Sequence, residues 1–270
     1  MDVPNLTPRV AAGIEIVPLL DAVGPMGEAL RRPPGELFPG GSAELWERVT
    51  ADEPKAFGPD GEWVLHFYCY LLRVPGGPNI LVDTGLGPLD SPAATWAPVP
   101  GDLVAALSKA GVAPAEIGTV VITHLHSDHA SGAVADGRPV FPNARHVLQN
   151  DELAWLERTR EPILAAILEP LREAGLVDTI SGDLRLAPDV QLIRTPGHTP
   201  GHQSIMVGDD EMLVTGDILH HPVQLADPSI TYLYDEDSEA ARVTRTALLA
   251  RIRERGGTLA TPHLPSPFNV

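Results

Sequence analysis

Three histidines and one aspartate stand within six residues of this chain, in the segment His124-Leu125-His126-Ser127-Asp128-His129. Imidazole nitrogens and carboxylate oxygens are ligands that zinc and similar divalent cations take in proteins. Groups of this kind packed so densely would be costly to bury without a cation to neutralise them. The segment therefore predicts a metal site.

The histidine cluster follows directly on an apolar run, Thr119-Val120-Val121-Ile122. The run is short, β-branched and uncharged, which is typical of a buried β-strand. The polar residues therefore leave the end of a strand, and Ser131-Gly132 with the neighbouring alanines indicate that a helix follows. A strand end is a rigid place from which to present side chains, because its sheet holds it.

Four further strand-like runs end on a histidine or an aspartate beside glycine or proline. These residues are Asp83 after 80–82, His198 after 190–194, Asp217 after 212–214, and His263 after 258–261. Each of them taken alone is more often structural than functional. Together with the histidine cluster they predict one metal centre at an edge shared by several strands.

The expected elements alternate between groups of strands and helices. Strands are expected at 14–20, 62–74, 79–82, 119–123, 144–148, 183–186, 190–194, 203–207, 211–215 and 258–261, and helices at 103–110, 151–174 and 238–255. Pro18 is expected to end the first of these, an edge strand. The order predicts a single α/β domain over 1–270, with two sheets packed together and helices outside.

Residues 21–61 differ from the rest of the chain, because prolines alternate there with many glycines. This stretch predicts a surface arm with one short helix at 43–49. Irregular stretches of this length are often lids or contacts to a partner subunit, and an ordinary ordered arm is an equal alternative. Phe38 and Trp46 of the arm, and Trp96 beyond it, are candidates for an apolar pocket wall.

Composition excludes several classes of partner. The net charge is −17, so neither a nucleic-acid backbone nor an anionic membrane is expected to bind. No apolar run reaches the roughly 20 residues that cross a bilayer, and the first residues lack the pattern of a signal peptide. Cys69 is the one cysteine, which excludes an intrachain disulfide and a cysteine-rich zinc site. We therefore expect a cytoplasmic protein whose partner is a small molecule.

With these motifs in view, the chain resembles the metallo-β-lactamase-fold hydrolases from Glu62 to His263. The motifs that carry the resemblance are Asp83-Thr84-Gly85, His124-x-His126-x-Asp128-His129, Gly197-His198, Gly216-Asp217 and His263. The resemblance implies a four-layered αββα sandwich with two mixed sheets, helices outside, and two metal ions at one end.

The resemblance also implies a role for each motif residue. The first ion would be held by His124, His126 and His198, and the second by Asp128, His129 and His263. Asp217 would bridge the two ions, and Asp83 would orient a ligand imidazole from behind. Zinc is the expected metal, and iron, manganese and cobalt are alternatives.

Departures from the family pattern narrow the choice of subfamily. The β-lactamases proper have no bridging aspartate of the Asp217 kind, and flavodiiron proteins have glutamate where this chain has His126. The segment from Gly216 to Pro228 is similar to the branch of methyl parathion hydrolase and the acyl-homoserine lactonase-like enzymes. His220 stands where the quorum-quenching lactonases often have tyrosine, and it is a candidate for orienting or polarising substrate, with a structural role as the alternative.

The resemblance implies a metal-dependent hydrolase that cleaves a lactone or carboxylic ester, with phosphotriesterase activity as a side reaction. A hydroxide shared by the two ions would attack, and the second ion would stabilise the oxyanion. Asp128 or Asp217 would carry a proton to the leaving group. The few basic residues favour a neutral substrate.

Two other classes stay open at this point. One is a non-catalytic, metal-stabilised binding or sensing protein on the same fold, which the complete ligand set disfavours. The other is a diiron redox protein, which the histidine-rich site disfavours. The sequence also leaves the oligomeric state open, and the apolar arm makes a homodimer one of the alternatives.

Overall fold

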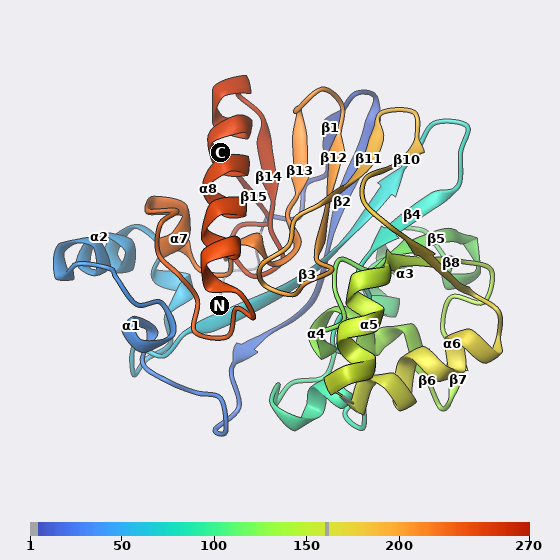
Figure 1. The fold of residues 1–270 in the computed structure, drawn as a ribbon, viewed down its shortest axis with the longest axis horizontal. Helices are drawn as coiled ribbons and strands as arrows, with labels where there is room; N and C mark the ends of the chain where they lie inside the picture. The colour runs from blue at the N-terminus through green and yellow to red at the C-terminus, as the bar shows by residue number, and fades with distance from the viewer. Residues whose placement is uncertain (1–4, 160–161) are drawn as a thin grey trace.

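Two β-sheets face each other across a buried apolar layer in the computed structural model (Figure 1), which describes residues 5–159 and 162–270. The first sheet has the strand order β1 (Arg9–Ala11), β2 (Ile14–Pro25), β3 (Val64–Arg73), β4 (Asn79–Val82), β5 (Ile117–Val121), β8 (Arg145–Gln149) and β9 (Val177–Ile180). The second has the order β10 (Leu184–Ala187), β11 (Val190–Arg194), β12 (Gln203–Val207), β13 (Met212–Val214), β14 (Thr258–Ala260) and β15 (Phe268–Asn269). A separate small hairpin joins β6 (Val134–Ala135) to β7 (Arg138–Pro139).

Helices cover the outer faces of both sheets. On the first sheet lie α3 (Leu103–Lys109), α5 (Asn150–Thr159) and α6 (Glu169–Glu173), and on the second lies α8 (Ser238–Arg255). The shorter helices are α1 (Pro34–Leu37), α2 (Ala43–Asp52), α4 (Ser127–Ala130) and α7 (Pro222–Ala226). Both sheets combine parallel and antiparallel pairs, so the αββα sandwich of mixed sheets expected from the sequence is confirmed.

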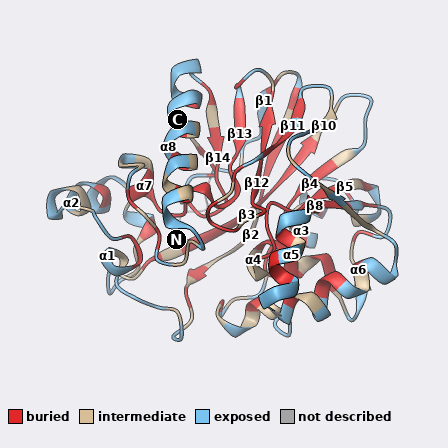
Figure 2. Cartoon of the chain, in the orientation of Figure 1, coloured by how far each residue is buried: buried red, intermediate tan, exposed pale blue. Residues whose placement is uncertain are grey.

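Strand β3 shows how the sequence builds the two apolar layers. Its side chains alternate, so Tyr70 and Leu72 point into the layer between the sheets while Leu71 points toward the outer helices. Because both faces are covered, its inner residues are buried without alternation, and all of them except His66 are apolar or aromatic. Figure 2 shows the same burial along the other central strands, with exposed residues on the outer helices and loops.

The strands that precede the predicted site residues end on one side of the sandwich. Strands β4 and β5 are parallel neighbours in the first sheet. In the second sheet β11 and β13 are both antiparallel to β12, and β14 is parallel to β13, so all three run in one direction. The residues that follow these strands are therefore gathered at a common edge.

The first long strand differs from the sequence prediction. Strand β2 continues through Pro18 to Pro25 and pairs with β3 along this whole length, so the prediction that Pro18 ends it is wrong. The physical reason is that β1 pairs only with Ile14 to Ile16. Pro18 lies beyond that pairing, where β2 is an edge and a missing N–H leaves no strand partner unsatisfied.

The proline-rich arm is more ordered than an irregular loop. Strand β2 occupies its first residues, and the predicted helix is confirmed as α2, whose N-cap Ser42 hydroxyl accepts a hydrogen bond from the Leu45 N–H. Leu37 and Phe38 of the arm are buried against Trp63 and Tyr232 in one apolar cluster. The arm therefore packs on the end of the sandwich at which β3 begins.

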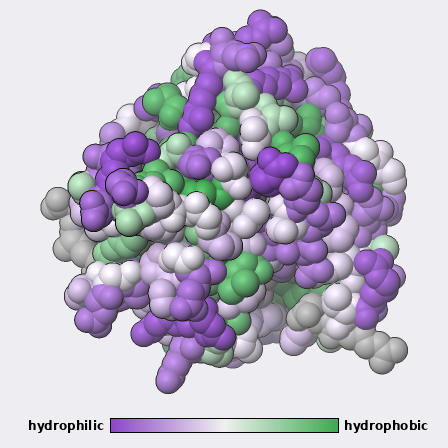
Figure 3. Space-filling view, turned by 60° about the vertical axis from the view of Figure 1, so that its left-hand side comes forward, coloured by the Kyte–Doolittle hydropathy of each residue, from purple (hydrophilic) through white to green (hydrophobic). Residues whose placement is uncertain are grey.

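The net charge of −17 predicts a largely hydrophilic surface. When the α1 and α2 end of the molecule is turned forward, hydrophobic residues form small separate patches between hydrophilic ones (Figure 3). In the part of the chain that the structure describes, no helix has both the length and the apolar character needed to cross a membrane.

Asp21 is a buried carboxylate at an irregular position of β2. Its Oδ2 accepts a hydrogen bond of 2.8 Å from the Leu86 N–H, while its Oδ1 has no hydrogen-bond partner among the described residues. A Cβ at Gly85 or Gly101 would lie within 2.5 Å of this carboxylate, so only glycine fits beside it. Burial raises the pKa of Asp21 to about 6.

We predict that Asp21→Asn becomes more stabilising as the pH rises. Between about pH 4 and pH 6 the unfolded chain releases this proton before the folded chain does, so the wild-type protein loses stability across that window. Asparagine does not titrate and keeps an oxygen for the Leu86 N–H. Denaturant unfolding should show its advantage over wild type growing by roughly 1 to 2 kcal/mol from pH 5 to pH 8. A pH-independent difference would contradict the raised pKa.

Candidate metal centre

The structure brings the seven predicted ligands together at the common strand edge. Four follow β5 and three come from the second sheet: His124, His126, Asp128 and His129, and then His198, Asp217 and His263. They fall into groups whose ligand atoms all lie within 4.8 Å of one another. The expected helix after β5 begins inside the cluster, as α4, so Asp128 and His129 point from one short turn.

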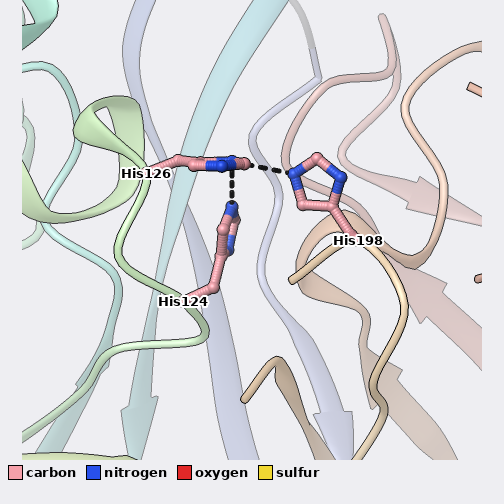
Figure 4. A group of neighbouring side chains, drawn as sticks. All are labelled: His124, His126 and His198. Atoms are coloured by element: carbon pink, nitrogen blue, oxygen red, sulfur yellow. Dashed lines mark hydrogen bonds between the residues drawn. The ribbon is translucent and has the colours of Figure 1, made fainter. Parts of the chain in front are cut away.

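The first group consists of three imidazoles. The Nδ1 atom of His126 lies 3.0 Å from His124 Nε2 and 2.9 Å from His198 Nε2 (Figure 4). In the figure, His124 and His198 approach this one nitrogen from two directions. These are the three residues predicted for the first ion.

The second group consists of Asp128, His129 and His263. The Nε2 atoms of the two histidines are 3.3 Å apart, and each lies 3.4 Å from Asp128 Oδ2. These are the three residues predicted for the second ion.

Asp217 lies between the two groups. Its Oδ2 is 3.5 Å from His198 Nε2 and 3.3 Å from His129 Nε2, and its Oδ1 is 3.2 Å from His263 Nε2. One carboxylate thus faces imidazoles of both groups, which is the position that a bridging ligand needs. The bridging role itself stays a prediction.

Acceptors behind the imidazoles fix where their protons lie. His129 Nδ1 is 2.8 Å from Asp83 Oδ2, and His198 Nδ1 is 3.0 Å from Asp235 Oδ1. His263 Nδ1 is 3.0 Å from the carbonyl oxygen of His66. Since these oxygens only accept, each Nδ1 carries the proton, and each Nε2 presents a lone pair to the centre.

His124 also carries its proton on Nδ1, because the Thr123 hydroxyl connects it to Asp83. The Thr123 hydroxyl donates to Asp83 Oδ2 at 2.8 Å and can therefore accept from His124 Nδ1, which lies 3.1 Å away. Asp83 also accepts a hydrogen bond of 2.7 Å from the Thr123 N–H. The carboxylate that was predicted to stand behind one imidazole thus lies behind two, directly for His129 and through Thr123 for His124.

The residues present fit bound cations. Four Nε2 lone pairs and the carboxylates of Asp128 and Asp217 converge, and Asp217 Oδ1 has no hydrogen-bond donor among the described residues. Acceptors facing one another without donors repel, and this cost is removed when a cation lies between them. Imidazole nitrogen and carboxylate oxygen are also the donor set that zinc prefers.

Electrostatics divides the histidines into two kinds. Burial and the neighbouring imidazoles hold the pKa of His124 well below its ordinary value and lower the pKa of His126 to about 3. Burial would also lower the pKa of His129, but the carboxylates of Asp217, Asp128 and Asp83 outweigh it and raise that pKa. The carboxylate charge that raises this pKa is the charge that a bound cation would neutralise.

Two residues that the sequence did not single out as site residues hold the ligand loops in place. His202 Nε2 accepts a hydrogen bond of 2.8 Å from the Asp217 N–H, and its Nδ1 lies 2.7 Å from the Thr195 hydroxyl. Glu152 accepts hydrogen bonds from the Leu125 N–H at 2.8 Å and from the Gly201 N–H at 3.0 Å. The only sequence signal was the Gly-His pattern before His202, since Glu152 sits in an ordinary helical stretch.

A cavity of about 590 Å³ opens over the centre. Trp96 lines it and donates a hydrogen bond of 2.8 Å from Nε1 to the Ser127 hydroxyl. The prediction for the other two aromatic residues is wrong: Phe38 is fully buried in the arm cluster, and Trp46 lines a separate groove. The arm folds on itself through α1 and α2, which keeps both rings out of the cavity over the centre.

His220, the predicted substrate-orienting residue, also lines the cavity. Its Nε2 lies 3.2 Å from Asp217 Oδ2, and its ring centroid lies 4.1 Å from that of Tyr232. Burial lowers the pKa of His220, so its ring is neutral at neutral pH. Its role toward substrate stays a prediction.

This fold and this arrangement of ligands define a family. The family model of the metallo-beta-lactamase superfamily matches residues 65–263, and the chain belongs to that superfamily, as its motifs predicted. An N-acyl homoserine lactonase of Bacillus sp is 33% identical over 156 residues, which are 53% of this chain and 58% of that protein. A hydroxyacylglutathione hydrolase of Acidiphilium cryptum is 32% identical over 114 residues, covering 41% of this chain and 39% of that protein. The chain thus spans less than two thirds of the length of these relatives.

Solved structures match over nearly the whole chain. The hydrolase AbOPH of the beta lactamase superfamily has a TM-score of 0.81 and 26% identity, with 99% of this chain and 92% of that chain covered. AidC, named a dizinc quorum-quenching lactonase and solved with a product, has a TM-score of 0.77 and 21% identity, with 99% and 93% covered. At 21% identity the second likeness shows a shared fold.

We predict that the purified protein binds close to two zinc ions per chain. Because the ions would neutralise converging acceptors, a chelator should lower the melting temperature, and zinc at about a thousand times its Kd should restore roughly 4 kcal/mol of stability. His263→Ala removes one ligand of the second group and should leave about one ion. Elemental analysis and thermal melts measure both effects.

The matched control is His146→Asn, because His146 is also fully buried but lies in β8, outside the ligand groups. It should keep two ions. A wild-type protein that holds one ion or none would contradict the two-ion centre.

Proposed function

We propose that this protein is a dinuclear-metal hydrolase that cleaves a neutral lactone or carboxylic ester. The observation that carries the proposal is the convergence of the seven strand-end ligands at the wall of a cavity large enough for a small substrate. Sites of this kind combine a few polar groups with an otherwise apolar lining, and this cavity has both. The names of the relatives, which are lactonases and other hydrolases, support the same class of reaction.

In the proposed assignment, His124, His126 and His198 hold one ion, Asp128, His129 and His263 hold the other, and Asp217 bridges them. Two divalent cations bound there supply Lewis acidity, which lowers the pKa of water and polarises a carbonyl group. No serine or cysteine nucleophile is then required of the chain.

The chain's own contribution is to hold protons and to orient the substrate. Burial would raise the pKa of Asp128, but His129 and His263 outweigh it and lower that pKa to about 2. Asp128 is therefore ionised at neutral pH and lines the cavity, so it is placed to accept a proton and pass it to the leaving group. Asp217 is the second candidate for this transfer, and neutral His220 is proposed to orient the substrate.

The lining of the cavity favours a neutral substrate with an apolar part. Trp63, Trp96, Trp155 and Ile163 line it, and the lining contains no lysine or arginine among the described residues. Asp235 and Glu236 add negative charge to the lining, so a free carboxylate or phosphate has no complementary side chain. Neutral phosphotriesters meet the same requirement, and we propose them as substrates of a side activity.

The remaining parts of the proposal concern the whole molecule. Zinc is the proposed metal, and AidC, a structure of the same fold, is named a dizinc lactonase. We propose that 1–270 form one domain, supported by the apolar cluster that joins the arm to Trp63 and Phe67. Cytoplasmic location and a homodimer stay predictions of the sequence.

We predict chelator-sensitive turnover on a panel of γ-lactones with short and long acyl chains, aryl esters, and a paraoxon-like triester. A neutral lactone or ester should be hydrolysed with the higher kcat/KM, and the triester should be slower. Activity should disappear on dialysis against a chelator and return with zinc. A panel without turnover by the two-ion protein would favour the non-catalytic binding protein, and visible absorbance with tightly bound iron would favour the redox protein.

We predict that Asp217→Ala lowers kcat/KM by at least roughly a hundredfold, because the carboxylate between the two ligand groups is lost. Circular dichroism should show that the sandwich is still folded. Asp209→Ala removes an exposed aspartate nearby in the sequence and should leave activity unchanged. Turnover retained in Asp217→Ala would contradict the bridging role.

A further inference from the structure

Asp235 is a carboxylate that belongs to none of the strand-end motifs, yet it touches a proposed metal ligand. We propose that Asp235 is a positioning residue for the first ion: it fixes the proton and the orientation of His198, and so ties the metal centre to the wall of the substrate cavity. The inference rests on the proposed two-ion centre and assigns no new step of the reaction.

The contact itself is direct and buried. Asp235 Oδ1 lies 3.0 Å from His198 Nδ1, and the Asp235 side chain is 0% exposed. Its Oδ2 accepts a hydrogen bond of 3.3 Å from the Tyr232 N–H. On the other side of the ring, His198 Nε2 faces His126 Nδ1 at 2.9 Å. The carboxylate therefore stands behind the ring, where it fixes the proton on Nδ1 and leaves the lone pair on Nε2 for the ion.

Backbone contacts join the same two segments. The Glu236 N–H donates to the carbonyl oxygen of His198 at 3.1 Å, and the Asp237 N–H donates to that of Gly197 at 2.9 Å. Gly197 has a φ of +141°, and a Cβ there would lie 2.2 Å from the backbone nitrogen of Ala241 in α8. The His198 loop is thus held between the start of α8 and the segment 232–237.

His198 differs in this from the other proposed ligands that have an acceptor behind them. His124, His129 and His263 are backed by Thr123, Asp83 and the His66 carbonyl, which belong to β3 or to the ends of β4 and β5. The partner of His198 belongs instead to a segment that lines the cavity, with Tyr232, Leu233, Tyr234, Asp235 and Glu236 all in the lining.

The cavity segment is in turn bound to the N-terminal arm. The Leu233 N–H donates to the carbonyl oxygen of Leu37 at 2.8 Å, and the Tyr234 hydroxyl donates to that of Leu30 at 3.2 Å. Hydrogen bonds therefore join the arm to the segment 232–237, and others join this segment to His198. A change in the cavity wall would therefore alter the binding of the first ion. The histidines proposed for the second ion are instead fixed by residues of the strands and their ends.

A different role for Asp235 has one observation in its favour. His198, His220 and Asp235 offer ligand atoms within 4.8 Å of one another, so they could hold a third cation. That cation would displace the proton of His198 Nδ1 and would make one imidazole bind ions through both nitrogens. Asp235 lies on the side of the His198 ring that faces away from His126, which favours the positioning role. The number of bound ions distinguishes the positioning role from the ligand role.

The experiment compares zinc binding by wild type, Asp235→Asn and Asp235→Ala in competition with a chromophoric chelator. We expect two ions in each, with the affinity for one of them lowered by roughly 10- to 100-fold in Asp235→Ala. The other ion should bind as in wild type. Asp235→Asn keeps an accepting oxygen and loses the charge, so its affinity for that ion should lie between those of wild type and Asp235→Ala. Asp90→Asn makes the same chemical change at an exposed residue outside the cavity lining and should bind both ions normally.

Three results would overturn the inference. Unchanged affinity for both ions in Asp235→Ala would show that the contact does not matter to the metal. Equal weakening of both ions would indicate a general structural role, and three ions in wild type with one lost in the variant would make Asp235 a ligand. If Asp235→Ala does not fold, Asp235→Asn decides by the same criteria. Because the readout is metal binding, a substrate panel without turnover would defeat the proposed function and leave this inference standing.

Discussion

The constraint on which this structure depends is the inward convergence of hydrogen-bond acceptors that have no donors. Each of four imidazoles directs its Nδ1 proton outward, to Thr123, Asp83, Asp235 or the His66 carbonyl. What remains in the middle is a set of lone pairs and carboxylate oxygens, which would be unfavourable in a buried place unless positive charge lies among them. The hydrogen bonds on the outer side of the imidazoles therefore create the preference for a cation on their inner side.

Sequence patterns predicted the parts of the molecule that depend on local chemistry. The apolar runs before Asp83, His124, His198, Asp217 and His263 located five strands, and the glycine, proline and polar residues after each run located their ends. The repetition of this pattern predicts one metal centre at a shared edge, and the residues do meet there. The family motifs also predicted the correct fold.

Contacts between distant segments could not be predicted in this way. Pro18 looked like the end of a strand, because the sequence does not show that β1 covers only the first residues of β2. Phe38 and Trp46 looked like candidates for the cavity wall, because nothing in the sequence shows how the arm folds back on itself. Asp235 carries no signal either, since an acidic residue just before a helix is ordinary and only the folded chain brings it to His198.

The two ligand groups each draw on both sheets. The residues after β5 come from the first sheet, while His198, Asp217 and His263 come from the second. Bound cations would therefore act as cross-links across the sandwich, and the order of the chain sets when they can form. A growing polypeptide lacks a complete set for the first ion until His198 has been made, and for the second until His263 has been made. With the proposed ligands, insertion of both ions would consequently follow the meeting of the two sheets.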